Sequence, residues 1–116
     1  MVKIKRVYDP VSPDDGRRIL VDRLWPRGLK KKEAAIDEWL KDIAPSSELR
    51  KWFAHDPSRW KAFERKYEEE LRKKPGFVAY LAEIAEREKI TLLFSARDRE
   101  HNNAFVLKGA IDQYQK

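Results

Sequence analysis

The stretch that decides the fold is Ile90-Thr-Leu-Leu-Phe-Ser-Ala-Arg-Asp-Arg-Glu-His-Asn-Asn-Ala-Phe-Val-Leu-Lys-Gly-Ala-Ile111. Its first five residues are apolar or β-branched, which is typical of a strand buried on both faces. After a polar turn over residues 95–103, apolar residues recur at helical spacing: Ala104, Leu107, Ile111 and Tyr114. The stretch therefore predicts a strand over residues 90–94 that leads into a helix over residues 104–114.

A second strand also ends in polar residues. Residues 18–23, Arg-Ile-Leu-Val-Asp-Arg, predict a short strand, and Leu24-Trp-Pro-Arg-Gly28 follows it. About 65 residues with a helical pattern separate this strand from residues 90–95, so the chain must cross over and the two strands are expected to be parallel. Their carboxyl ends then share one crevice, and ligands of open α/β folds bind outside the carboxyl ends of strands.

The rest of the chain predicts a single α/β domain over residues 1–116, with a small, mostly parallel sheet of about three strands covered by five helices. Val2 to Val7 alternate apolar and basic residues, as a half-buried strand does. The expected helices begin near residues 30, 47, 57, 76 and 103. The first should bury Ile36, Trp39, Leu40 and Ile43, and the second and third should bury Trp52 and Trp60.

Composition narrows the class of protein. The 116 residues are 41% apolar and 40% charged and contain no Cys, which suits one folded domain with a highly charged surface and excludes disulfides and thiolate chemistry. No apolar run is long enough to span a membrane, so we expect a cytoplasmic protein with no membrane partner. The charge content and the single Met favour a thermophilic source.

The net charge of +6 is concentrated at the start of the chain. Residues 1–32 hold ten Lys or Arg and four Asp, whereas the remainder holds sixteen of each sign. This basic excess is expected either to attract an anionic partner or only to solvate the surface.

The predicted crevice contains residues suited to an anion. Arg23, Arg27 and Arg97 are expected to bind phosphate or carboxylate, with Asn102 and Asn103 adding donors at a helix N-terminus. The alternative is that Asp22 pairs with Arg23, and Asp98 with Arg97, as structural ion pairs.

Other residues of the crevice suggest proton transfer or pocket walls. Asp22 or Asp98, together with His101, could handle protons. Asp98 is also expected as the N-cap of the last helix, with His101 in its first turn. Trp25 and His55 are expected to line the pocket, although core packing and a helix connection are the competing interpretations.

Several common sites are not supported by spacing. His55, His101, Asp22 and Asp98 have no metal-binding spacing, so no metal is expected, and the sequence names no cofactor. Ser95 lacks the G-x-S-x-G elbow of serine hydrolases. The four glycines form neither a dinucleotide fingerprint nor a P-loop.

The longer motifs resemble a known family. These motifs are Asp15-Gly-Arg-Arg-Ile-Leu-Val-Asp-Arg-Leu-Trp-Pro-Arg-Gly28, Trp39-Leu-Lys-Asp-Ile-Ala-Pro-Ser46, Leu49-Arg-Lys-Trp-Phe-Ala-His-Asp-Pro57, Leu92-Leu-Phe-Ser-Ala-Arg-Asp98 and His101-Asn-Asn-Ala104. They resemble the YeaO-like proteins of the family called domain of unknown function 488. The resemblance implies a small prokaryotic single-domain α/β protein and no particular reaction. It implies as site residues the motif positions Asp22, Arg23, Trp25, Arg27, His55, Asp56, Arg97, Asp98, His101 and Asn102.

These observations lead to one hypothesis and one alternative. The hypothesis is a crevice at the carboxyl ends of strands 18–23 and 90–95 that binds a small phosphorylated or carboxylated molecule, such as a nucleotide, with or without hydrolase or transferase activity. The alternative is a non-enzymatic nucleic-acid-binding protein that uses the basic residues of the N-terminal third: Lys3, Lys5, Arg6, Arg17, Arg18 and Lys30 to Lys32.

Overall fold

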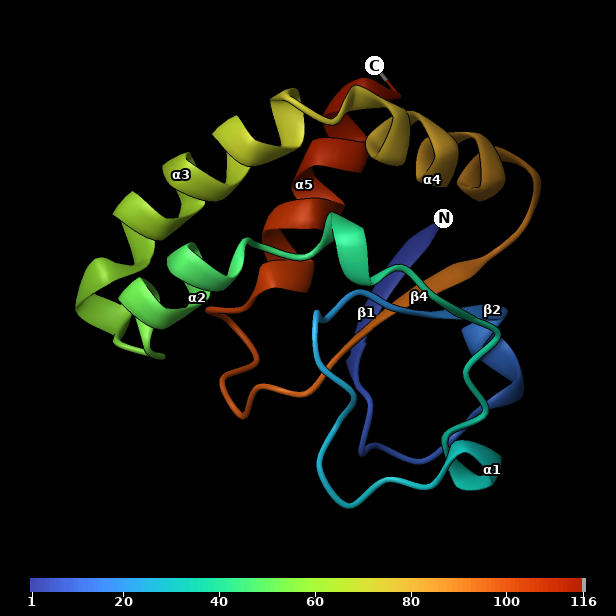
Figure 1. Ribbon diagram of the computed structural model, residues 1–116. Helices are drawn as coiled ribbons and strands as arrows, with labels where there is room; N and C mark the ends of the chain where they lie inside the picture. Colours follow the sequence, from blue (N-terminus) through green and yellow to red (C-terminus); the bar gives the residue numbers. More distant parts are fainter. Residues whose placement is uncertain (116) are drawn as a thin grey trace.

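The computed structural model describes residues 1–115 and contains one sheet of four parallel strands. The strands are β1 (Val2–Arg6), β2 (Arg17–Leu20), β3 (Glu38–Trp39) and β4 (Ile90–Phe94). Their order in the sheet is β1-β4-β2-β3, so β4 pairs with both β1 and β2 (Figure 1). The parallel pairing predicted for the second and last strands is confirmed.

Five α-helices accompany the sheet: α1 (Lys31–Ala34), α2 (Ser47–Phe53), α3 (Trp60–Arg72), α4 (Pro75–Arg87) and α5 (Asn103–Tyr114). Three short 3-10 helices lie in the connections: Pro13–Asp15 between β1 and β2, Lys41–Ile43 between β3 and α2, and Pro57–Arg59 between α2 and α3. Figure 1 shows α2 to α5 gathered on one side of the strands and α1 on the other. The predicted α/β class with five helices is therefore confirmed, but the sheet has four strands and is parallel throughout.

Alternate residues of the strands pack on opposite faces of the sheet. Ile19 and Leu92 belong to the main core beneath the helices, with Leu81 and Leu107 among their partners. On the opposite face, Leu20 and Leu93 form a smaller core with Val7, which Trp25, Leu29, Ile36 and Trp39 cover. Every residue of β4 is consequently buried, which is why its sequence is continuously apolar.

The prediction of one helix from residue 30 to residue 43 is wrong. Helix α1 ends after one turn because Ala35 adopts a left-handed backbone with φ 48°. The chain then pairs as β3 with β2 and continues as a 3-10 helix. Ile36 and Trp39 cover the smaller core, whereas Ile43 enters the main core. The spacing of these apolar residues reflects two faces of a sheet and not one face of a helix.

Two other burial predictions, for Trp52 and Tyr114, also need correction. Trp52, expected in the core, is 38% exposed, whereas Trp60 is half-buried and packs against the main core as predicted. Tyr114 continues the apolar spacing of α5 but is 58% exposed at the end of the helix. Across residues 1–115, no helix is both long and apolar enough to cross a membrane.

Candidate functional site

A cavity of about 460 Å³ opens at the carboxyl ends of the strands. Its walls come from five parts of the chain: the loop after β1, the loop after β2, the segment from Ala44 to His55, helix α3, and the turn between β4 and α5 with the start of α5. Eight residues proposed from the sequence line it together: Asp22, Arg23, Trp25, Arg27, His55, His101, Asn102 and Asn103. The two polar strand exits therefore do form one crevice, as parallel pairing predicts.

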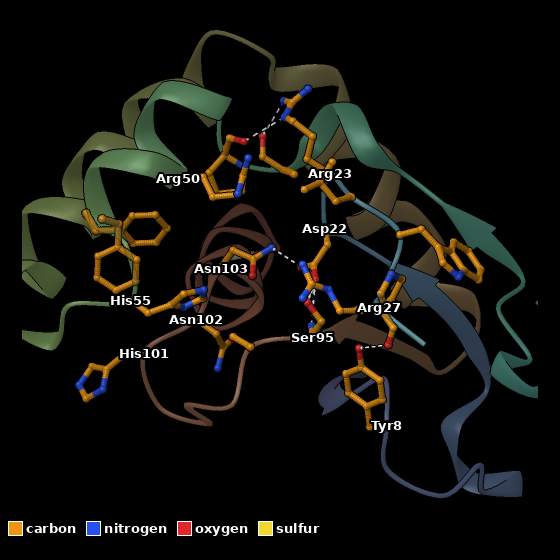
Figure 2. Close-up of a pocket in the computed structure, with 18 residues that line it drawn as sticks. Tyr8, Asp22, Arg23, Arg27, Arg50, His55, Ser95, His101, Asn102 and Asn103 are labelled. Carbon is orange, nitrogen blue, oxygen red and sulfur yellow. Dashed lines mark hydrogen bonds between the residues drawn. The ribbon is translucent and has the colours of Figure 1, made fainter. Parts of the chain in front are cut away.

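Asp22 lies at the centre of this pocket, next to Ser95 (Figure 2). Its Oδ2 atom accepts hydrogen bonds from the Ser95 backbone N–H at 2.9 Å and from the Ser95 hydroxyl at 2.7 Å, and its Oδ1 atom accepts one from Asn103 at 3.1 Å. Burial raises the pKa of Asp22, although the bonds from Ser95 and Asn103 and the nearby charge of His55 oppose the rise. Among residues 1–115, Asp22 is the single carboxylate that lines the pocket.

Three arginines surround this carboxylate: Arg23, Arg27 and Arg50. Arg23 donates through Nε and one Nη to the backbone carbonyls of Pro45 and Ala44, at 3.2 and 3.3 Å, which fixes its guanidinium. Figure 2 shows Arg23 and Arg50 on one side of Asp22, and Arg27 beside Tyr8 on the other. None of the three forms an ion pair with any acidic residue within residues 1–115.

The structural ion pairs considered as an alternative are therefore wrong: Asp22 does not pair with Arg23, nor Asp98 with Arg97. Arg97 is exposed and, like Asp98, does not line the pocket. Arg50 lines the pocket instead, from helix α2. The motif Leu49–Pro57 contains Arg50, but the sequence interpretation missed it because it lies within a helix, 27 positions after Arg23, and not at the end of a strand.

Asn102 and Asn103 use their side chains within the protein. Asn102 is the N-cap of α5, accepting from the Phe105 N–H and donating to the Asp98 carbonyl. The amide of Asn103 donates to the Val21 carbonyl at 2.9 Å as well as to Asp22. Since an amide NH₂ has two hydrogens, Asn103 has no further side-chain donor for a ligand and instead orients Asp22.

Asp98 and His101 form a pair at the pocket mouth. Asp98 does not cap α5 as expected; it accepts from the N–H groups of Glu100 and His101, and its other oxygen lies 2.8 Å from Nδ1 of His101. These bonds hold the pKa of Asp98 below its usual value. His101 precedes the N-cap, so it is not in the helix, and Figure 2 shows its ring directed away from Asp22. Asp98 therefore holds the His101 imidazole in a fixed orientation, but the imidazole does not face Asp22.

The remaining pocket walls are aromatic or apolar. Trp25 lines the pocket and donates from its indole N–H to the Leu29 carbonyl at 2.6 Å. Tyr8, Phe53 and Phe63 also contribute, and none of these three was predicted from the sequence. The Tyr8 hydroxyl donates to the Arg27 carbonyl at 2.8 Å and so joins the loops after β1 and β2.

Most basic residues of the N-terminal third are engaged in the protein itself. Arg18 is 3% exposed and pairs with buried Asp15, which Lys5 also contacts at 3.0 Å. Arg17 pairs with Glu88, and Arg6 donates to the carbonyls of Ser95 and Ala96. Among the described residues of this third, Arg27 and Lys30 to Lys32 are exposed and their side chains form no such bonds. Several of the basic side chains are thus engaged within the protein and are less available to an external partner.

Metal ligands do not gather in the described part of the chain. Between residues 1 and 115, no group of three or more His, Asp or Glu side chains is arranged to hold a metal ion. His55 and His101 both line the pocket, but with Asp22 as the single carboxylate beside them.

The fold and the pocket together define a small α/β domain with a polar cavity at the carboxyl ends of parallel strands. The chain belongs to the domain of unknown function 488 family: residues 1–116 match the model described as "Inactive DUF488-N3 subclade".

Bacterial relatives agree with this membership. The chain is 48% identical over 106 residues to Uncharacterized protein YeaO of Escherichia coli (strain K12), covering 91% of this chain and 92% of that protein. It is 41% identical over 106 residues to Uncharacterized protein Rv3073c of Mycobacterium tuberculosis (strain ATCC 25618 / H37Rv), covering 91% and 89%. No solved structure matches the chain significantly.

Proposed function

We propose that the pocket binds a small molecule through a phosphate or carboxylate group, and that the protein acts as a binding protein. One observation carries this proposal: Arg23, Arg27 and Arg50 converge on a cavity with a single carboxylate, and none of them has an acidic partner within residues 1–115. Guanidinium groups bind phosphate and carboxylate with paired, charge-assisted hydrogen bonds. A fixed Arg23 reduces the entropy lost when the anion binds.

Binding is favoured over hydrolysis or group transfer for two reasons. The matched subclade carries the description "inactive". In addition, the oriented Asp98–His101 pair directs its imidazole away from Asp22, so the two groups proposed for proton transfer do not face one reacting atom. The nucleic-acid alternative is less well supported, because Arg18 is buried and Lys5 and Arg17 are paired internally.

The test is calorimetric titration with inorganic phosphate, phosphate monoesters and short carboxylates at low ionic strength. We expect saturable binding of at least one anion to the wild type, and loss of about tenfold in affinity in Arg50→Ala. Arg65→Ala is the matched control, because Arg65 is an exposed arginine of α3 that does not line the pocket. An equal loss in both variants would indicate general charge attraction, and the absence of binding to the wild type would refute the proposal.

A further inference from the structure

The pocket is larger than an anion alone requires. A volume of about 460 Å³ lies within the range of about 300–1,000 Å³ that is usual for pockets holding whole metabolites. Beyond the three arginines, its lining combines apolar surfaces, such as Trp25 and Phe63, with the hydrogen-bonding groups of Asp22 and His55. The ligand must therefore carry a substantial uncharged part besides its anionic group.

Asp22 determines which chemical group of the uncharged part can bind beside it. A carboxylate has about four lone-pair positions, and Ser95 and Asn103 occupy three of those of Asp22. The remaining position accepts a hydrogen bond from a ligand donor. The negative charge of Asp22 also disfavours a second anionic group beside it. The group recognised there is therefore a donor such as a hydroxyl.

His55 lines the same pocket as Asp22 and has an unusual backbone conformation. Ala54 and His55 follow helix α2 with φ values of 47° and 56°, so two successive residues with side chains adopt the left-handed region. Such a conformation costs free energy that glycine would avoid. Figure 2 shows the His55 side chain directed into the pocket, where it makes no hydrogen bond with the described residues. The ring packs against Phe53, with centroids 6.3 Å apart, and this contact leaves both ring nitrogens without a hydrogen-bond partner among the described residues. An imidazole in this strained position, with its nitrogens unused, points to a ligand contact.

We propose that Asp22 and His55 bind a hydroxyl group within the pocket that the arginines line, and that the ligand is a phosphorylated sugar or polyol. This inference rests on the proposed function and specifies its ligand class. Three guanidiniums suit the charge of about −2 on a phosphate monoester better than the single charge of a carboxylate. The apolar walls suit the C–H faces of a sugar.

A pair of ligands that share the phosphate but differ in hydroxyls tests the class. Calorimetric titration compares glucose 6-phosphate with n-hexyl phosphate, and glycerol 3-phosphate with n-propyl phosphate. We expect at least one hydroxylated ligand to bind about tenfold more tightly than its alkyl counterpart. Equal binding of both members in both pairs would overturn the hydroxyl inference and leave anion binding intact. No binding of any phosphate would overturn the proposed function as well.

A pair of glycine variants tests the role of His55. Ala54→Gly and His55→Gly relieve the same kind of backbone strain, and we expect neither to lower the thermal midpoint. His55→Gly should lose about fivefold or more of the preference for the hydroxylated ligand while still binding the alkyl phosphate. Ala54→Gly should keep that preference, since Ala54 does not line the pocket. A His55→Gly variant that keeps the full preference would refute the assignment. His55→Asn provides the same comparison if the glycine variant fails to fold, because asparagine tolerates the left-handed region.

Discussion

The Asp22 carboxylate accepts hydrogen bonds from both the backbone N–H and the hydroxyl of Ser95, at 2.9 and 2.7 Å, although 73 positions separate the two residues. Asp22 follows β2 and Ser95 follows β4, so these bonds join the carboxyl ends of two paired strands at the centre of the pocket. The same interaction that completes the sheet therefore also orients the one acidic group of the site.

Replacement of this carboxylate should destabilise the fold. Asp22→Asn retains one oxygen and adds N–H donors facing the donors of Ser95 and Asn103. We expect the free energy of unfolding to fall by about 1–3 kcal/mol, measured by urea denaturation. Asp37→Asn is not a suitable control, since Asp37 accepts from the Arg18 N–H. Asp42→Asn is preferable, because Asp42 is exposed and its carboxylate forms no hydrogen bond with the described residues. An unchanged midpoint in Asp22→Asn would show that the bonds to Ser95 contribute nothing.

Asp15 should make stability depend on acid pH. Burial raises the pKa of this carboxyl, but the bonds from Ser12, Lys5 and Arg18 prevail and lower it to about 2, from an ordinary value of 3.8. A lowered pKa stabilises the folded state above 3.8, and this contribution, on the order of 2 kcal/mol, is lost as the pH falls towards about 2. Denaturation curves recorded over this range should show the loss in the wild type. Asp15→Asn should be less stable at neutral pH and should lack this part of the pH dependence.

Asp22 should make stability depend on pH in the opposite direction from Asp15. Because burial raises its pKa, the folded protein retains this proton at a higher pH than the unfolded chain does. Its contribution to stability is therefore greatest below the unfolded value and declines as the pH rises through the folded value. The difference in unfolding free energy between wild type and Asp22→Asn should narrow as the pH rises. A difference that widens over the same range would contradict the raised pKa.

Two glycines should respond to alanine in opposite ways. At Gly16, which has φ +63°, an added Cβ would lie 2.3 Å from the Lys89 carbonyl oxygen, and that oxygen accepts from the Arg17 N–H. Gly16→Ala should cost at least about 2 kcal/mol. Gly109 lies within α5 with open space around it, so Gly109→Ala should stabilise the protein by about 0.5–1 kcal/mol. Chemical denaturation measures the free energy of unfolding of both variants, and a change of the same sign in the two would contradict this prediction.

Arg23→Ala and Arg50→Ala should both weaken phosphate binding, but only Arg23→Ala should clearly lower stability. Arg23→Ala removes two bonds to the carbonyls of Pro45 and Ala44 and should cost about 1–2 kcal/mol of unfolding free energy as well as phosphate affinity. Arg50→Ala removes an exposed side chain without hydrogen bonds to residues 1–115, so its unfolding free energy should change by less than about 0.5 kcal/mol. Parallel urea denaturation and phosphate titration measure both quantities. A similar loss of stability in the two variants would contradict this distinction.

The fold could be predicted where one pattern dominated. The continuous apolar run of β4 and the parallel pairing of β2 with β4 follow from burial on both faces and from the long crossover. Strand β3 was missed because it has only two residues and because apolar residues alternate between two cores at a spacing that also fits a helix. The left-handed backbone of Ala35, which ends α1, has no marker in the sequence.

The site could be predicted only in part for a similar reason. Residues next to strand ends, such as Asp22 and Arg23, are brought together by the topology of the sheet. Arg50 approaches from a helix whose placement depends on the main core. Asp98 and Asn102 are both residue types that favour an N-cap, so the sequence does not decide between them. In the structure Asn102 caps α5, and Asp98 instead accepts hydrogen bonds within the preceding turn.

The position of β4 between β1 and β2 has a consequence for synthesis of the chain. The first two strands do not pair with each other, and the strand that joins them begins only at Ile90. A nascent chain therefore cannot complete its sheet until residues 90–94 have left the ribosome. Until then β1 has no partner strand and β2 has only the two-residue β3, so chains terminated before Ile90 should aggregate or attract chaperones.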